Sequence, residues 1–347
     1  MKILVTGGAG YLGSVLVPKL LARGHCVRVL DIGYFGVNSL PSAYSRMEFI
    51  HDDIRKVVTK QSAIDNLMDG CDCVIHLAAI SNDPSAELDP GLTFDVNLRA
   101  SEALAEKARN IRVPFLFSSS CSVYGDAPGE IDETGDVRPL TIYAETKVRA
   151  EQTLNQLADR SWKPLILRNG TLFGYSPRMR FDLVVNIFCL HSTLHNRIAV
   201  FGDGRQWRPF LHVTDCARAF VHFAERQEAE YTCYNLAHEN LRVVDLALMF
   251  GEMNPSLTVT HIDSSNEDRR DYSVSSARLR KSGFETKTDV RTGAEALVDA
   301  ITTGAIRDPE SIYYRNAKWL KELTTLRDDD HVHITAVMRT LTRIVGA

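Results

Sequence analysis

Residues 2–13 read Lys2-Ile3-Leu4-Val5-Thr6-Gly7-Gly8-Ala9-Gly10-Tyr11-Leu12-Gly13. The apolar first half predicts a buried strand, and the apolar spacing of residues 12–23 predicts a helix directly after the glycines. Glycines at such a strand-to-helix turn let the backbone approach a pyrophosphate, whose charge then lies at the helix N-terminus. The stretch therefore predicts a dinucleotide-binding turn. A glycine-rich turn without a ligand is the alternative for such a motif taken alone.

A second β-rich run, residues 27–31, ends in Asp31, eighteen residues beyond Gly13. A carboxylate at this place accepts hydrogen bonds from the hydroxyls of an adenosine ribose and repels a 2′-phosphate. Asp31 therefore favours NAD over NADP, and the alternative is an acid in an exposed turn.

The first half of the chain alternates strand patterns with amphipathic helical patterns. We expect strands at 2–6, 27–31, 47–51, 73–77, 114–119 and 164–168, and helices at 12–23, 93–109 and 143–158. Such alternation is typical of βαβ units, so it predicts an α/β fold of the Rossmann type, with a doubly wound parallel sheet covered on both faces.

The rhythm becomes less regular after residue 169, where helical patterns remain at 182–195, 213–227 and 243–251. We expect a Rossmann domain at 1–168 and a smaller, mixed α/β substrate-binding region at 169–305. This region interleaves with the first, and a cleft lies between the two. Residues 306–347 form a tail with a helical pattern, to which the sequence assigns no role.

The composition excludes several classes of protein. A formal net charge of −4 over 347 residues provides no electrostatic footprint for nucleic acid or an anionic membrane. The sequence contains no run of 18 apolar residues, so we expect no membrane span. The seven cysteines are scattered, and Cys71-Asp72-Cys73 lacks a second ligand pair, so we expect reduced core thiols, no metal and a cytoplasmic location.

Tyr143 and Lys147 lie four residues apart on a helical stretch, which puts both side chains on one helix face. An ammonium close to a phenol favours the phenolate, so we expect Lys147 to lower the pKa of Tyr143. The alternative is that Tyr143 and Lys147 lie on a solvent-exposed helix surface without a catalytic role. The hydroxyls of Ser118-Ser119-Ser120 stand at the carboxyl end of an expected strand, which is the edge where open α/β sheets bind ligands.

Several motifs occur together and in order: the glycine-rich start, His76-Leu77-Ala78-Ala79, Asn97, 118–125 (SSSCSVYG), Tyr143 with Lys147, and 201–215 (FGDGRQWRPFLHVTD). In this combination the chain resembles the extended short-chain dehydrogenases, the NAD-dependent epimerase/dehydratase family, from residue 1 to about residue 300.

The resemblance implies roles for individual residues. Tyr143 would be the general base, Lys147 would hold the nicotinamide ribose, and Ser120 would bind the reacting oxygen. The alternative for Ser120 is a structural role, as a buried hydroxyl that is hydrogen-bonded to the backbone. The implied cofactor residues are Gly7, Gly10, Tyr11, Leu12, Gly13, Asp31, Asp53, Ile54, Leu77, Ala78, Ala79, Asn97, Tyr143 and Lys147. The implied substrate residues are Ser120, Ser122, Tyr143, Thr171, Arg178, Arg180, Arg208 and Arg270.

The arginines suit a diphosphate because the guanidinium fork matches phosphate oxygens, although exposed arginines usually only solvate a surface. Arg208 matches the phosphate-binding arginine of the family, and Arg270 is the second candidate. Arg178 and Arg180 precede a helix whose N-terminus adds anion affinity. Thr171 and Asp182 stand where many relatives carry asparagines.

The residues after Ser120 bear on the reaction. Dehydratases of this family carry Asp-Glu there, whereas this chain has Cys121 and Ser122, neither of which is an obvious proton donor at neutral pH. We therefore expect an NAD-dependent epimerase that oxidises and re-reduces a carbon of a nucleoside-diphosphate sugar, usually C4, through a ketone.

Other readings remain open. A net 4-dehydrogenase is the close alternative, since 176–180 (SPRMR) resembles a subgroup that includes oxidoreductases acting on GDP-heptoses. A 4,6-dehydratase is less favoured. A protein that senses NAD without turnover belongs to a different class. Such proteins typically lose the catalytic tyrosine or lysine, whereas this chain has both Tyr143 and Lys147. The family also implies a homodimer formed through helices at 97–110 and 143–158.

Overall fold

The computed structural model describes residues 1–41, 45–226, 229–263 and 270–330. Its centre is a seven-stranded sheet in the order β11-β7-β5-β4-β1-β2-β3, and every neighbouring pair is parallel. The strands are β1 Lys2–Thr6, β2 Cys26–Asp31, β3 Met47–His51, β4 Cys73–His76, β5 Phe115–Ser120, β7 Leu165–Asn169 and β11 Cys233–Leu236. The prediction of a Rossmann-type parallel sheet is confirmed.

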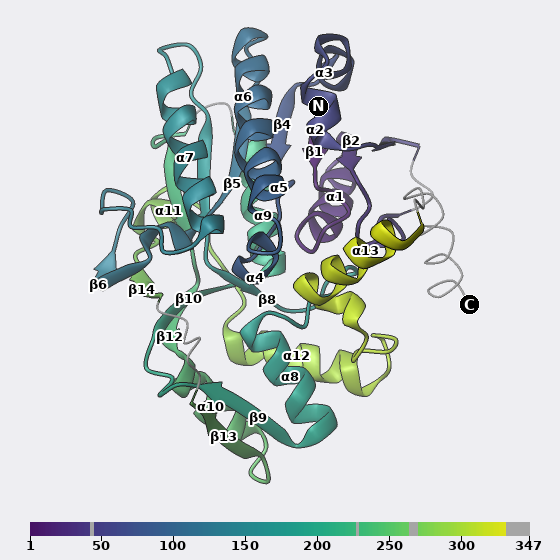
Figure 1. Cartoon of the computed structure of the whole chain (residues 1–347). Helices are drawn as coiled ribbons and strands as arrows, with labels where there is room; N and C mark the ends of the chain where they lie inside the picture. Colours follow the sequence, from purple (N-terminus) through teal and green to yellow (C-terminus); the bar gives the residue numbers. More distant parts are fainter. Residues whose placement is uncertain (42–44, 227–228, 264–269, 331–347) are drawn as a thin grey trace.

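Helices cover both faces of this sheet (Figure 1). Side chains alternate along a strand, so Ile3 and Val5 face one core while Leu4 faces the other. The first face carries α1 Gly13–Ala22 and α9 Val213–Ala224. The second carries α2 Ile54–Val58, α3 Gln61–Met68, α6 Ala100–Asn110 and α7 Ile142–Leu157. Burial on both faces explains why the strands are nearly continuous apolar runs.

The helix expected at 93–109 is a composite of three segments. They are α5 Pro90–Phe94, a π-helical turn at Asp95–Arg99 and α6. A short helix, α4 Asp83–Ala86, precedes them. π-Helical turns inserted in helices often occur at functional sites, and this one contains Asn97.

Smaller sheets and helices form a second layer, in the lower part of Figure 1. The sheets are β12-β10-β8 (Glu239–Arg242, Trp207–His212 and Thr171–Phe173), β13-β9 (Thr258–Ile262 and Arg197–Phe201) and β14-β6 (Asp271–Val274 and Asp126–Ile131). The helices of this layer are α8 Val184–His195, α10 Val243–Met253 and α12 Val290–Thr302, whereas α11 Ala277–Lys281 packs against β11 of the large sheet and lies beside α7 in Figure 1. The chain returns to the large sheet between these segments, because α9 and β11 belong to the parallel layer.

The tail contains a 3-10 turn, η3 Ile312–Tyr314, and the helix α13 Asn316–Asp330. The helical pattern at 335–345 lies outside the described residues. Figure 1 shows α13 between the parallel sheet and the layer that contains α8 and α12. None of the helices in the described ranges has the length and apolar character that crossing a bilayer requires.

All seven cysteines are free. Five of them are buried, as expected for core thiols, whereas Cys26 is exposed and Cys233 is partly buried. The expectation of core thiols is therefore wrong for Cys26, which is the exposed first residue of β2.

Candidate active site

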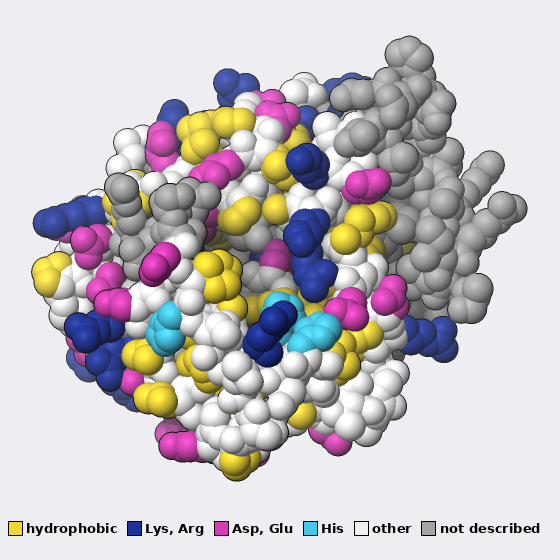
Figure 2. All heavy atoms as spheres, turned by 60° about the horizontal axis from the view of Figure 1, so that its bottom comes forward, with side chains coloured by type: hydrophobic (Ala, Val, Ile, Leu, Met, Phe, Trp, Pro, Cys, Tyr) yellow, Lys and Arg dark blue, Asp and Glu magenta, His cyan; other side chains and the backbone are white. Residues whose placement is uncertain are grey.

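A cavity of about 790 Å³ lies between the two layers. Seen from the lower end of the molecule, the surface is hollowed in the middle, with Lys and Arg side chains along the margin (Figure 2). Twenty of the residues expected at a site line this cavity: Gly7, Gly10, Tyr11, Leu12, Gly13, Asp31, Asp53, Ile54, Leu77, Ala78, Ala79, Ser120, Ser122, Tyr143, Lys147, Thr171, Arg178, Arg180, Arg208 and Arg270. The tertiary structure thus brings together residues from the whole length of the described chain.

The glycine-rich turn connects β1 to α1 at one end of the cavity. Gly7 has a φ of +73°, and a Cβ added to it would lie 2.7 Å from the backbone nitrogen of Ala78. A Cβ on Gly13 would lie 2.5 Å from the carbonyl oxygen of Gly7. Larger residues at either position would therefore disrupt the turn. The bare backbone and the N-terminus of α1 form a cradle that fits a dinucleotide diphosphate.

Asp31 ends β2 beside this turn and lines the cavity. Its two carboxylate oxygens accept hydrogen bonds from the N–H groups of Ala9, at 2.9 Å, and Gly33, at 2.8 Å. Burial raises the pKa of Asp31, and the two N–H donors oppose that shift. The carboxylate is fixed with lone pairs left for ligand hydroxyls, as an adenosine ribose requires.

Asp53 and Ile54 line the cavity at the start of α2. Asp53 caps this helix by accepting a hydrogen bond from the backbone N–H of Arg55, and it also forms an ion pair with the Arg55 side chain at 2.6 Å. The cap fixes the position of Ile54, whose backbone opens the helix next to the cavity.

Asn97 is the expected cofactor residue that the structure places outside the cavity lining. It is fully buried, and its side chain binds both backbone groups of Ile80, accepting from N–H at 2.8 Å and donating to C=O at 3.2 Å. It also donates to the hydroxyl oxygen of Thr146 at 3.2 Å. The expected cofactor contact of Asn97 stays a prediction, and in the structure its side chain ties the loop after β4 to α7 from behind the cavity wall.

Tyr143 and Lys147 occupy the first turns of α7, which begins after Thr141. The Thr141 hydroxyl caps the helix by accepting a hydrogen bond from the N–H of Ala144. The Lys147 ammonium donates to the carbonyl oxygen of Ser118 at 2.8 Å, and it lies 5.8 Å from the centroid of the Tyr143 ring. The cap and the bond to β5 hold both side chains at the cavity wall.

Burial and, to a smaller extent, the negative charge of Asp83 raise the pKa of the Tyr143 phenol to about 12. Three groups lower it: a hydrogen bond with Ser120 and the positive charges of Arg180 and Arg270. Two opposed sets of charges therefore control the protonation of this phenol.

Lys147 does not lower the pKa of Tyr143 in the way the spacing suggested. The phenol is buried, so the loss of hydration outweighs the hydrogen bond with Ser120 and the positive charges of Arg180 and Arg270, and the pKa of Tyr143 rises instead. Burial also lowers the pKa of Lys147 to about 8, while the charge of Glu151 opposes that shift. Glu151 lies one helix turn beyond Lys147 and helps to keep the ammonium charged.

Glu151 belongs to a buried network behind the site that the sequence analysis did not identify. It accepts a hydrogen bond from the Ser119 hydroxyl at 2.5 Å and forms an ion pair with Arg168 at 2.6 Å. Arg168 in turn donates to the Tyr124 hydroxyl at 2.8 Å. The available signal was the four-residue spacing Tyr143, Lys147, Glu151, which places all three on one side of α7.

Cys121 and Ser122 follow Ser120, and both are buried. Cys121 is fully buried, its thiol donates to the carbonyl oxygen of Arg168, and burial raises its pKa. It is a structural thiol rather than a proton shuttle. The Ser122 hydroxyl lines the cavity, and no partner for it exists among the described residues.

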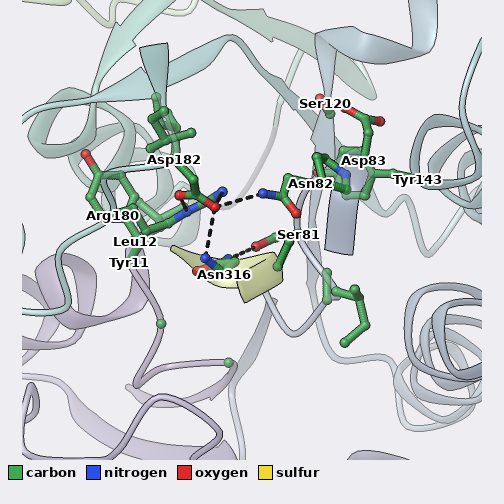
Figure 3. A pocket seen from close by; sticks show the side chains of 18 of the residues that line it. Tyr11, Leu12, Ser81, Asn82, Asp83, Ser120, Tyr143, Arg180, Asp182 and Asn316 are labelled. Carbon is green, nitrogen blue, oxygen red and sulfur yellow. Dashed lines mark hydrogen bonds and ion pairs between the residues drawn. The ribbon is translucent and has the colours of Figure 1, made fainter. Parts of the chain in front are cut away.

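The substrate-side arginines are held by protein groups. Arg208 is 5% exposed and donates to the carbonyl oxygens of Trp207 and Arg270. Arg270 forms an ion pair with Asp83 at 2.7 Å, which places Asp83 close to Tyr143 (Figure 3). Thr171 lines the cavity from β8, beside β10. None of these three is a simple solvated surface residue.

Asp182 is the centre of a network that crosses the cavity (Figure 3). Its carboxylate pairs with Arg180 at 2.9 Å and accepts from the Asn82 amide at 2.8 Å and the Asn316 backbone N–H at 3.2 Å. The network joins the loop after β4, the segment before α8 and the start of α13. Sequence reasoning missed Asn82, Asp83 and Asn316, although 81–83 directly follow the expected strand and the Leu77-Ala78-Ala79 motif.

Arg178 lies at the cofactor end of the cavity rather than the substrate end. Its backbone N–H donates to the hydroxyl of Ser14 in the first turn of α1, and its guanidinium lies 3.8 Å from the centroid of the Phe35 ring. Both of these neighbours belong to the segments around the glycine turn and Asp31, and the expected substrate contact of Arg178 stays a prediction.

The fold and cavity together define a dinucleotide-dependent enzyme of the Rossmann type. The model of the NAD dependent epimerase/dehydratase family matches residues 3–237. The chain belongs to this family, and the glycine turn and Asp31 are consistent with its cofactor, NAD.

Known relatives catalyse more than one reaction. The chain is 32% identical over 247 residues to the UDP-glucose 4-epimerase of Neisseria meningitidis serogroup C, covering 63% of this chain and 72% of that protein. It is 27% identical over 333 residues to UDP-glucuronic acid decarboxylase 1 of Arabidopsis thaliana, covering 89% and 72%. The solved UDP-glucuronic acid 4-epimerase of Bacillus cereus, in complex with UDP-glucuronic acid and NAD, superposes with a TM-score of 0.75 at 26% identity, covering 87% and 99%.

Proposed function

We propose that the chain is a nucleotide-sugar epimerase that oxidises and re-reduces one sugar carbon, C4, through a ketone. One observation carries the proposal: a single cavity contains the glycine turn, Tyr143, Ser120 and Lys147, and no acid–base pair follows Ser120 in its wall. The 4-epimerases among the relatives support the same reaction.

In this proposal the chain's own residues move the proton. Tyr143, as phenolate, takes the proton of the sugar hydroxyl, and the Ser120 hydroxyl holds the same oxygen by a hydrogen bond. NAD, which the glycine turn and Asp31 would hold, would supply the hydride acceptor and a positive charge that favours the phenolate. Tyr143 gives the proton back when the ketone is reduced on its other face. Lys147, anchored on Ser118, stays charged beside the phenol.

Water elimination is disfavoured by the residues after Ser120. A dehydratase needs an acid and a base near the leaving hydroxyl, and the buried Cys121 thiol has a raised pKa and lies behind the wall. Asp83 faces Tyr143 but is already ion-paired with Arg270. The site thus has a base for hydride chemistry without a second pair for elimination.

Arg208 and Arg270 are the groups proposed to bind the diphosphate of the sugar nucleotide. Both line the cavity, and Arg270 pairs with a carboxylate that a diphosphate would replace. Guanidinium groups suit this exchange because carboxylate and phosphate oxygens have the same bidentate geometry.

The test is a product analysis. The purified protein is incubated with UDP-, GDP-, dTDP- and CDP-sugars without added oxidant, and products are examined by mass spectrometry and NMR, with Tyr143→Phe as the control. A product of unchanged mass with inverted C4 is expected. Loss of two hydrogens would instead indicate a 4-dehydrogenase and loss of water a dehydratase. Conversion of none of the sugars would favour an NAD-sensing role.

A further inference from the structure

The tail segment 312–320 closes the cofactor end of the cavity. Arg315, Asn316, Ala317, Lys318 and Leu320 line it. The segment contains η3 and the first turns of α13, and it follows the last helix of the second layer along the chain.

Two hydrogen bonds fasten this segment to the loop after β2. The Trp319 indole N–H donates to the carbonyl oxygen of Tyr34 at 2.7 Å, and the Tyr313 hydroxyl donates to the carbonyl oxygen of Phe35. Tyr34 and Phe35 also line the cavity, a few residues beyond Asp31. The tail is therefore attached directly to the loop that borders the proposed adenosine site.

Arg178 connects the tail to the glycine turn. Its guanidinium donates to the Asn316 side-chain oxygen at 2.6 Å, while its backbone is bonded to Ser14 in α1. Figure 3 shows Asn316 at the start of α13, linked to Asp182 and Ser81. The Arg178 backbone is thus bonded to the first turn of α1 and its guanidinium to the first residue of α13, and the N-termini of both helices favour negative charge.

The Arg178 guanidinium forms no ion pair with a described carboxylate, and the charges of Asp182 and Asp31 act on it without direct contact. Arg178 is 1% exposed, and its Nε donor has no partner among the described residues. Its face is covered by the Phe35 ring at 3.8 Å. A buried, unpaired charge is costly, so its presence in a cavity wall indicates a site for an anionic ligand.

We propose that Arg178 and residues 312–320 form a cofactor clasp that binds the NAD diphosphate as a second wall beside the glycine turn. The bonds to Tyr34 and Phe35 keep the clasp closed, so NAD is retained between turnovers. The clasp depends on the NAD cofactor of the family and not on which sugar reaction the enzyme performs.

The decisive variant is full-length Arg178→Met, which keeps the side-chain volume and removes the charge. NADH release, followed by its fluorescence, should be roughly 10- to 100-fold faster, since a hydrogen bond to a charged group is lost. Arg178→Lys should release NADH at an intermediate rate, because it keeps the charge without the fork. Lys321→Ala is the control, since Lys321 is on α13 but outside the cavity lining.

Thermal unfolding separates binding from a structural role. Without NAD, the Tm of Arg178→Met should equal or exceed that of the wild type, because an unpaired buried charge is removed. The increase in Tm caused by saturating NAD should be smaller. A lower Tm without NAD, combined with wild-type release, would show that Arg178 is only structural and would overturn the proposal.

The closure is tested by Trp319→Phe, which removes the bond to Tyr34 and keeps the ring, and by Asn316→Ala. Each should accelerate NADH release several-fold relative to Lys321→Ala. Wild-type release in both would overturn the clasp. Because these assays contain no sugar, their result is independent of whether the product analysis shows epimerisation.

Discussion

At the scale of single residues, the charge of Asp83 adds to burial in making Tyr143 lose its proton less easily. Burial and the Asp83 charge both raise the pKa of the phenol. Asp83→Asn removes a negative charge, so the phenolate is favoured and the pKa of Tyr143 falls. The acidic limb of kcat/KM should therefore move to lower pH. A pH–rate profile measures this, with Asp136→Asn as an exposed control, and a shift to higher pH would contradict the electrostatic model.

Tyr143→Phe should abolish most turnover and leave NAD binding intact. The change removes only the hydroxyl that acts as general base, and such catalysis contributes roughly 10²- to 10⁴-fold. Steady-state rates and NAD titration give the two quantities. A rate close to that of the wild type would remove Tyr143 from the mechanism.

The sequence predicts site residues that stand at a fixed spacing from a strand or along one helix. It does not predict residues that reach the site only through contacts between distant parts of the chain. The glycines, Asp31, Tyr143 and Lys147 stand at fixed offsets from a strand or within one helix, and all line the cavity. Asn316 reaches the site only because the tail folds back over it. The raised pKa of Tyr143 likewise depends on burial, which spacing does not show.

At the scale of elements, one buried ion pair couples α7 to β7. The Arg168 and Glu151 side chains are 8% and 5% exposed, and Arg168 also holds Tyr124. Arg168→Met would leave a buried carboxylate unpaired, so the free energy of unfolding should fall by about 3–5 kcal/mol.

Chemical denaturation of Arg168→Met and Arg205→Met tests this prediction. The Arg205–Asp203 pair has a separation of 3.6 Å and side chains that are 81% and 62% exposed, so its loss should change stability little. Equal effects in the two variants would mean that burial does not control the contribution of the pair.

Six strands of the large sheet could be predicted, whereas its short edge strand β11 and the strands of the small sheets could not. The inner strands of the large sheet are buried on both faces and therefore have nearly continuous apolar sequences. By contrast, β13 pairs with β9 across the second layer, and its residues are largely exposed. Short, exposed strands whose partner is distant in sequence have no periodic pattern strong enough to identify them.

At the scale of the whole molecule, we predict a homodimer formed through α6 and α7. The two helices pack side by side on one outer face of the sheet (Figure 1), so two subunits could form a four-helix interface. Sedimentation at micromolar concentration should give twice the 38.8 kDa mass of one chain. A mass of one chain would refute the prediction.

After the second layer the chain returns to the large sheet as β11, and this connection affects both the folding of the enzyme during synthesis and its engineering. The edge of β7 has no partner until residues 233–236 pair with it, so during synthesis that edge stays open while β8, α8, β9 and β10 leave the ribosome. A chimera that takes its substrate half from a relative by a single crossover after β7 would also replace α9 and β11. Exchange of specificity between relatives therefore requires two separate grafts, on either side of residues 213–236, with the native sheet edge kept intact.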